Sequence, residues 1–151
     1  MTWRDICDAW SEDLALNVPE LAGARRHLYA PVSVEALFAE GEERHVAVWP
    51  EAEAESSEGF VTTPGVLLRR QFVITVWESA SNESTRRIDD EERAAAWLEL
   101  QEAIVDRILR RDAIQMGGVD STSYAGTQFG LAAGVRFIEL RLRTVQGRDY
   151  V

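Results

Sequence analysis

The chain has no lysine and only one cysteine, Cys7, among its 151 residues. A single cysteine cannot form an intrachain disulfide, so the fold depends on its apolar core. Near its start the sequence lacks the basic stretch followed by an apolar run that marks a signal peptide. No apolar run approaches the roughly 20 residues that span a bilayer. These absences lead us to expect a protein of a reducing cytoplasm, or of a particle assembled there, without a membrane partner.

Because lysine is absent, all 16 basic residues are arginine, and 26 acidic residues outnumber them to give a formal net charge of −10. A chain this acidic repels DNA and anionic lipid unless its charges segregate. Its arginine pairs are scattered, which is typical of a solvated or ion-paired surface. Arginine also suits protein interfaces, because its planar guanidinium pairs with carboxylates at two points. If one pair is functional, Arg69 and Arg70 are the best candidates, since an acidic segment ends shortly before them.

Two segments have the apolar period of a helix. In the first, apolar residues recur at positions 3, 6, 7, 10 and 14, which predicts an amphipathic helix that Thr2 caps and that ends before Pro19. In the second, residues 89–111, acids crowd the start and arginines the end, as the helix dipole favours. We expect the buried stripe of this second helix to consist of Trp97, Leu98, Ile104, Val105 and Ile108.

Two segments alternate between apolar and polar residues, as half-buried strands do. In residues 45–55 one side is expected to carry Val46, Val48, Ala52 and Ala54, and the other His45, Trp49, Glu51, Glu53 and Glu55. In residues 135–145 the inward side is expected to carry Ile138, Leu140 and Leu142, and the outward side Phe137, Glu139, Arg141 and Arg143.

A third strand, residues 71–77, is apolar on both sides. Phe72, Ile74 and Val76 form one face, and Val73, Thr75 and Trp77 the other. Such a strand is either central and covered on both faces, or its second face is buried by another chain.

Weaker signals complete the pattern. Residues 25–34 contain Pro31 and suit an edge strand or an extended loop, and residues 34–42 suit a short helix. The glycine-rich residues 116–134 suit one or two weak strands. Residues 1–151 are therefore expected to form one α+β domain. Its mixed or antiparallel sheet of about four to five strands would pack against one long helix and an N-terminal helix and carry a long β-hairpin arm.

The arm lies within residues 49–65, WPEAEAESSEGFVTTPG, and is expected to be flexible over about residues 50–65. This segment carries the carboxylates Glu51, Glu53, Glu55 and Glu58 and no basic residue. Its alternating Glu and Ala extend the strand that starts at residue 45, while Ser, Gly and Pro make the tip flexible. A solvated hairpin tip explains this composition. The alternative is a docking arm, for which Phe60 and Val61 would be the anchors.

We find no catalytic arrangement in the sequence. Cys7 lies on the apolar stripe of the first helix, where a small core residue is more frequent than a nucleophile. His27 and His45 are far apart in sequence and lack a neighbouring cysteine or histidine cluster, which argues against zinc. The acids of residues 89–92 suit a helix start, and residues 116–119, MGGV, lack the spacing of a phosphate loop. We therefore expect a protein that is not an enzyme, with no catalytic residue, metal ion or cofactor.

The order of the elements resembles a known family. An N-terminal helix precedes an edge segment and two strands joined by a long arm, and a long helix and a final strand follow. With the segments RRQFVITVWES, RRIDDEERAAAWLELQEAIVDRIL and GVRFIELRLRT, the chain resembles the tail terminator proteins of long-tailed bacteriophages, also called tail completion or minor tail-joining proteins. The resemblance covers nearly the whole chain and rests on the pattern of elements and on apolar and arginine positions.

This resemblance implies a structural protein of the virion, without chemistry, that forms a hexameric ring. The ring caps the tail tube at its head-proximal end, stops its polymerisation and presents a surface for head–tail joining. The implied partners are further copies of the chain, the major tail tube protein, a neck or head-completion protein, and passing DNA that is not bound specifically. The candidate ring-interface residues are Arg69, Arg70, Val73, Trp77, Phe137, Glu139, Arg141 and Arg143.

Two alternatives stay open. The first is a head-closure or neck adaptor of the same virion, with a related fold. The second is a small ligand-binding or enzymatic domain, whose pocket would lie near the glycine-rich loop of residues 117–134.

Overall fold

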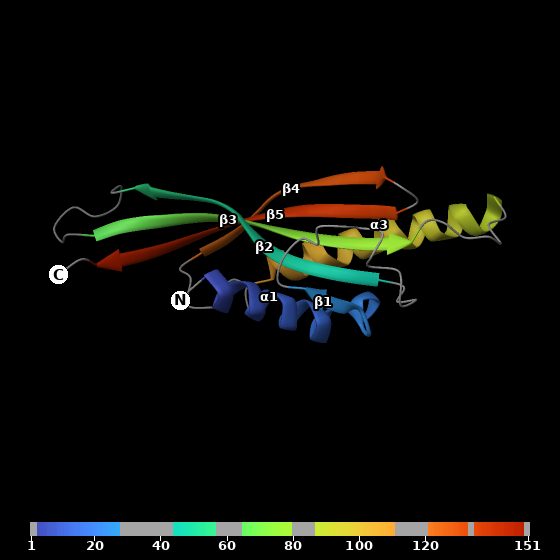
Figure 1. The fold of residues 1–151 in the computed structure, drawn as a ribbon, viewed down its shortest axis with the longest axis horizontal. Helices are drawn as coiled ribbons and strands as arrows, with labels where there is room; N and C mark the ends of the chain where they lie inside the picture. Colours follow the sequence, from blue (N-terminus) through green and yellow to red (C-terminus); the bar gives the residue numbers. More distant parts are fainter. Residues whose placement is uncertain are drawn as a thin grey trace.

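The computed structural model describes residues 3–27, 44–56, 65–79, 87–110, 121–132 and 135–149. The short helix expected at residues 34–42 and the arm-tip residues Glu58, Phe60 and Val61 lie outside these ranges. Along the chain (Figure 1) the elements are α1 (Trp3–Asn17), the 3₁₀ helix η1 (Pro19–Leu21), β1 (Arg25–His27), β2 (Arg44–Ser56), β3 (Gly65–Ser79), α3 (Arg87–Leu109), β4 (Ser121–Ala132) and β5 (Val135–Asp149).

The five strands form one sheet in the order β1-β2-β3-β5-β4. β1 runs parallel to β2, and the other neighbouring strands are antiparallel. β3 and β5 pair along their whole length, from Gly65 opposite Asp149 to Ser79 opposite Val135. The two apolar faces of residues 71–77 predicted a central strand as one of two possibilities, and β3 does lie at the centre of the sheet. The expected α+β fold is confirmed, with five strands in a mixed sheet.

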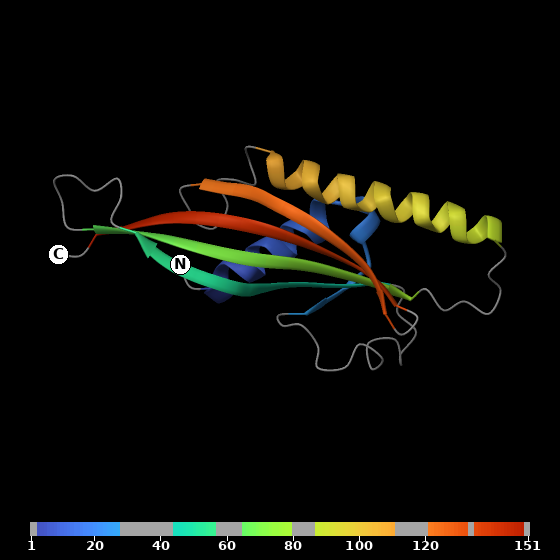
Figure 2. The same cartoon turned by 90° about the horizontal axis from the view of Figure 1, so that it is seen from above.

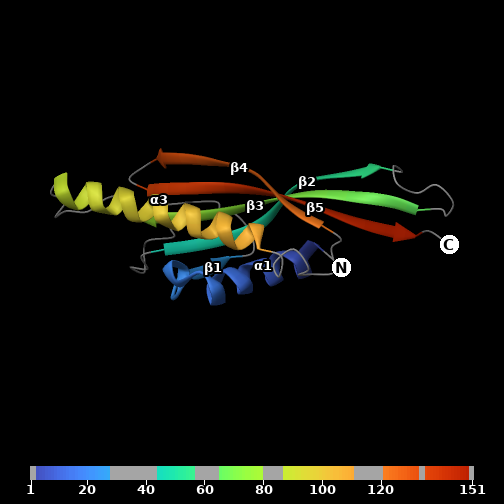
Figure 3. The ribbon, with the colours of Figure 1, turned by 180° about the vertical axis from the view of Figure 1, so that it is seen from behind.

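Both helices pack on the same face of the sheet and bury one core with it. Figures 2 and 3 show α3 running along this side of the strands. α1 contributes Ile6, Cys7, Trp10 and Leu14 of its predicted stripe, and the sheet contributes alternate residues of β2, β3 and β5. The largest fully buried side chains are Trp10, Phe72, Ile6, Leu14, Leu21, Ile74, Leu100, Ile104, Ile108, Ile138, Leu140 and Leu142.

The contact between α3 and the core differs from the expected stripe at Leu98, at Leu100, which is buried although it was not expected, and at Val105, which is only partly buried. Trp97, Leu100, Ile104 and Ile108 are buried, at helical spacings of three and four. The expected burial of Leu98 is wrong, because its side chain is 53% exposed. Position 98 lies about 100° around the helix from position 97 and so points away from the sheet. The sequence pattern was ambiguous here because leucines occupy both faces of this helix.

A β-bulge interrupts β2 at Glu51. Pro50 lies opposite Phe72 and Ala52 opposite Gln71, so Glu51 is an extra residue without a partner position on β3. A bulge shifts the period-two alternation by one residue. The alternation expected through residue 55 is therefore right up to Trp49 and wrong beyond the bulge, where the positions exchange faces.

β1 is short, and a histidine pair joins it to β2. His27 and His45 share a hydrogen bond between Nε2 and Nδ1, 2.8 Å apart, and their rings are stacked with centroids 5.1 Å apart. The large sequence separation of these residues hid this contact, because only the parallel pairing of β1 with β2 brings them together.

Candidate interaction surface

The face of the sheet opposite the helices carries a small apolar cluster at one end. Ala47, Trp77 and Val135 are buried there, and Trp49 and Phe137 pack against them while partly exposed. The indole Nε1 of Trp49 donates a hydrogen bond to Oγ1 of Thr75, 3.1 Å away, which fixes the orientation of the Trp49 ring.

Two candidate interface residues on this face, Val73 and Trp77, are buried within one chain. Val73 and Trp77 were candidate interface residues because a single helical layer would leave their face exposed. Their side chains are only 1% and 6% exposed within one chain. Within one chain, Trp49 and Phe137 are the members of this cluster whose side chains remain partly exposed.

Next to the apolar cluster, polar side chains of three strands form a connected network on the same face. Arg141 on β5 lies 3.2 Å from Glu51 and 3.3 Å from Glu139. Gln71 on β3 donates to Glu51 at 2.5 Å and accepts from Nε of Arg143 at 3.2 Å. At the bulge, the carboxylate of Glu51 contacts Gln71 on β3 and Arg141 on β5. The structure thus brings the predicted residues Glu139, Arg141 and Arg143 together with Glu51.

Arg69 and Arg70 lie side by side in β3 but differ in exposure. Arg69 is exposed, whereas the side chain of Arg70 is only 5% exposed. Arg70 pairs in register with Glu53 on one side and Thr144 on the other, and Thr144 is also buried. Arg70 is therefore buried within one chain, and its place in a ring interface stays a prediction. Arg70 belongs to the interior at the point where the arm begins.

The predicted arm is a three-stranded ribbon in the structure. The pairing of β4 with β5 ends at Ser121 opposite Val145, whereas the pairing of β3 with β5 continues to Gly65 and Asp149. β2 continues alongside to Ser56, and Figure 1 shows these three strands extending beyond β4. Glu53 and Glu55 occupy ribbon positions opposite Arg70 and Leu68. Glu51 lies at the base of the ribbon, where its carboxylate contacts Gln71 and Arg141 of the polar network.

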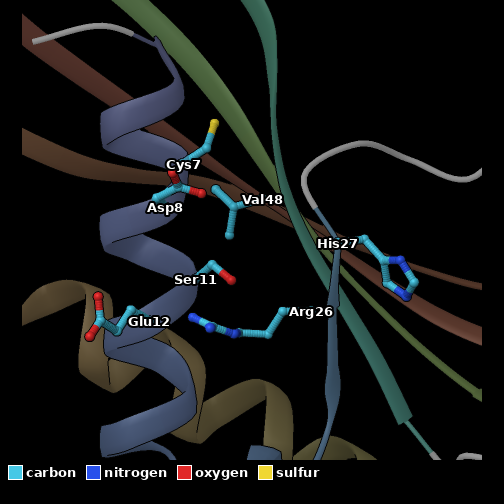
Figure 4. Close-up of a pocket in the computed structure, with 7 residues that line it drawn as sticks. All are labelled: Cys7, Asp8, Ser11, Glu12, Arg26, His27 and Val48. Atoms are coloured by element: carbon cyan, nitrogen blue, oxygen red, sulfur yellow. The ribbon is translucent and has the colours of Figure 1, made fainter.

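A cleft of about 540 Å³ opens between α1 and β1, at a place that the sequence did not indicate. Figure 4 shows Arg26 of β1 pointing toward Ser11 of α1, with Asp8 and Glu12 also on the helix side. Cys7 also lines it and is buried, which raises the pKa of its thiol to about 11, with Asp8 adding to the shift. A thiol with this pKa is protonated at neutral pH and is a poor nucleophile.

Two further properties concern only the described part of the chain. No three or more histidine, cysteine, aspartate or glutamate side chains there are grouped so that they could hold a metal ion. Of the helices described, none has the length and apolar character that crossing a membrane requires.

Comparison with known proteins gives matches in structure only. No protein-family model and no curated protein matches the chain. A solved chain from the virion of a native gene transfer agent particle superposes with a TM-score of 0.59 and 18% identity, covering 93% of each chain. A second solved chain, from the sheath/tube terminator of an extracellular contractile injection system in its extended state, superposes with a TM-score of 0.50 and 11% identity.

The second match covers 99% of this chain but only 58% of the terminator chain. At these identities the matches show a shared fold. Both solved chains belong to virion or tail-like particles, which is consistent with the resemblance of the sequence to phage tail terminator proteins.

Proposed function

We propose that this chain is a structural tail protein that forms a ring on the end of the tail tube, ends its polymerisation and provides the surface to which the head joins. The observation that carries the proposal is the fold shared with a virion component over 93% of both chains. The fold shared with a tube terminator gives further support. The copies of the ring, the major tail tube protein and a neck protein would be its partners, at the head-proximal end of the tail.

The chemistry of the polar network suits this role. Its charged side chains contact one another on the partly exposed region of the sheet face opposite the helices, and their carboxylates and guanidinium groups offer the paired hydrogen bonds that interfaces use. The proposed ring contacts on this face are the residues whose side chains are at least partly exposed within one chain: Arg69, Phe137, Glu139, Arg141 and Arg143. Val73, Trp77 and Arg70 support the face from within.

The ribbon extends the proposal to the tube and the genome. A long ribbon that projects beyond β4 can reach a neighbouring ring or line the opening of its own. Carboxylates at positions 53, 55 and 58 would repel the phosphates of DNA, so the genome would pass without sticking. Phe60 and Val61 are the proposed anchors where the arm tip docks on the tube.

Deletion of the gene tests this function and separates it from the neck-adaptor alternative. Without a terminator, tails should be overlong or unstable, and supplying the intact chain should restore tails of uniform length. Electron micrographs of the particles give the length distribution directly. Tails of normal length beside leaking heads would instead favour the adaptor, and normal particles would exclude both.

A further inference from the structure

A closed ring of identical copies needs two different, complementary surfaces on each copy, because its contacts are head-to-tail. The network on the open sheet face supplies one of them. The second has to lie elsewhere on the chain and has to match that face in charge and in apolar content.

The outward side of α3 has both properties. Leu98 and Leu109 are 53% and 60% exposed there, although leucine is one of the residues most often buried. They lie about 16 Å apart along the axis, at a rise of 1.5 Å per residue, and only about 20° apart around it. The fully buried residues of α3 lie on the side that carries Trp97 and Ile104, while Val105, which lies between the two leucines, is partly buried against the core.

Acidic residues surround these two leucines. At about 100° per residue, the positions of Glu91, Glu102 and Asp106 fall within about 80° of Leu98, and all three residues are exposed. Of these carboxylates, Asp106 is shared with Arg110, in an exposed ion pair of 3.4 Å. The outward side of α3 is therefore an apolar strip with a strongly acidic border.

The open sheet face has the opposite balance. Arg69, Arg141 and Arg143 contribute three positive charges, and Glu51 and Glu139 contribute two negative ones, in a chain whose net charge is −10. The part of β5 from Phe137 to Arg143 is about 20 Å long at 3.3 Å per residue, close to the spacing of the two leucines. The rims of Trp49 and Phe137 provide apolar contacts at one end.

We propose that the outward side of α3 in one copy packs on the exposed part of the sheet face opposite the helices in the next copy, with Leu98 against Phe137 and with Leu109 and the acids of α3 against Arg141 and Arg143. The two surfaces lie on opposite sides of a two-layer molecule, so the contact repeats head-to-tail. In a pair of copies, one surface on each copy would still be available for a further copy. This inference rests on the proposed ring and names the second half of its contact.

Another mode of association is less favourable. Among the described strands, β2 has no partner on this edge beyond β1, but a neighbour's strand would pair poorly there, because Pro50 lacks a backbone N–H and the bulge at Glu51 follows it. The proposed contact between α3 and the sheet face is made by side chains and does not require pairing at this strand edge.

Cross-linking between two populations of variants, each with one added cysteine, tests the contact. One population carries Leu109→Cys and the other Arg143→Cys, and each bears a tag of different mass. Cys7 is buried and protonated at neutral pH, so it reacts little with a short bis-maleimide. The variants are mixed at increasing concentration up to about 1 mM, and are also co-expressed in the particle-producing strain, because assembly on tails raises the local concentration.

We expect cross-links between the two populations to exceed cross-links within each population by at least about fivefold. Adding Glu102→Arg to the Leu109→Cys variant should reduce them about tenfold. A matched control places the cysteine at Glu12 on α1, which is also exposed but lies on the cleft side. Equal or absent mixed cross-links, or a control that cross-links as well, would overturn the contact. If tails are nevertheless terminated by the intact chain, only this inference fails and the proposed function stands.

Discussion

The carboxylate of Asp13 in α1 accepts two hydrogen bonds from the guanidinium group of Arg107 in α3, at 2.6 and 2.8 Å. Both side chains are largely shielded from solvent, with 8% and 16% exposure. Asn17 donates a further hydrogen bond to the same carboxylate at 2.9 Å. This pair joins two helices that are 94 residues apart in the chain and fixes their relative position on the sheet.

Removing one member of this pair should be costly. Asp13→Ala leaves the Arg107 charge in a shielded place without its bidentate carboxylate, so we expect the free energy of unfolding to fall by about 2–4 kcal/mol. Urea denaturation followed by circular dichroism measures the change. Asp106→Ala is the matched control, because its ion pair with Arg110 is exposed and should contribute less than about 0.5 kcal/mol. Equal effects of the two substitutions would show that the Asp13–Arg107 pair does not hold the helices together.

The raised pKa of the Cys7 thiol leads us to expect a loss of stability at alkaline pH. Its pKa is raised from 9.0 to about 11 in the folded chain, so the unfolded chain loses the thiol proton first as the pH rises. The contribution of this group is fully present below pH 9 and is lost as the pH rises toward 11. We expect the free energy of unfolding to fall between these values by about 2 kcal/mol more than in Cys7→Ala, in which other titrating groups are unchanged. Parallel curves for the two proteins would refute this assignment.

Gly130 and Phe137 lie opposite each other on β4 and β5. We expect this position to be sensitive to substitution of the glycine. A methyl group at position 130 would overlap the end of the Phe137 ring. Gly130→Ala should therefore displace the ring and weaken the proposed contact between copies, at a modest cost of about 1 kcal/mol in stability. The ring proton chemical shifts of Phe137 report the displacement.

Gly126→Ala serves as the comparison for this substitution. Gly126 has a φ of 128°, which strains any other residue, but no atom lies within 4 Å of an added methyl group. The Gly126→Ala substitution should lower the stability of the chain and leave the ring proton chemical shifts of Phe137 unchanged. If Gly130→Ala also left them unchanged, the close packing of the glycine against the ring would be refuted.

The register of β2 with β3 allows the ribbon to be shortened without disturbing the sheet below it. Ala54 lies opposite Arg69, so replacing residues 55–68 with Asn-Gly joins paired positions through a two-residue turn. We expect a chain that keeps its thermal stability within a few degrees but no longer terminates tails in a complementation assay. Loss of folding would show that the ribbon stabilises the domain, and full complementation would refute its role in docking.

A separate substitution tests the charge of the ribbon. Replacing Glu53, Glu55 and Glu58 with glutamine keeps the length and removes three negative charges. We expect normal tails but slower release of the genome, because DNA would be repelled less as it passes. DNA-ejection kinetics measure this, and rates equal to those of the unmodified particle would contradict a role of these carboxylates in DNA passage.

Local periodicity predicted the elements well, whereas positions that depend on pairing between strands escaped it. The apolar stripe of α1 and the alternation of Ile138, Leu140 and Leu142 follow from spacing alone, whereas spacing left the central place of β3 as one of two possibilities. The bulge at Glu51 does not follow from spacing, because nothing in an alternating Glu and Ala sequence marks which residue is left out of the ladder. The burial of Val73 and the exposure of Leu98 depend on packing between distant segments.

The candidate surface was predictable from the sequence only where its residues lie on one strand. Glu139, Arg141 and Arg143 share one face of a single strand, so their grouping is local. Their connection to Glu51 and Gln71 requires three strands in register, and the acidic outward side of α3 gains significance only once the opposite sheet face is known to carry arginines.

The central claim is that this chain occupies one end of a tail tube. Cryo-electron microscopy of tails that carry a C-terminally tagged copy, decorated with an antibody fragment against the tag, tests it most directly. The account predicts density for the antibody at the head-proximal end of each tail, with the copies arranged around the tube axis. Decoration along the length of the tube, at the distal tip only, or nowhere on assembled tails would contradict it.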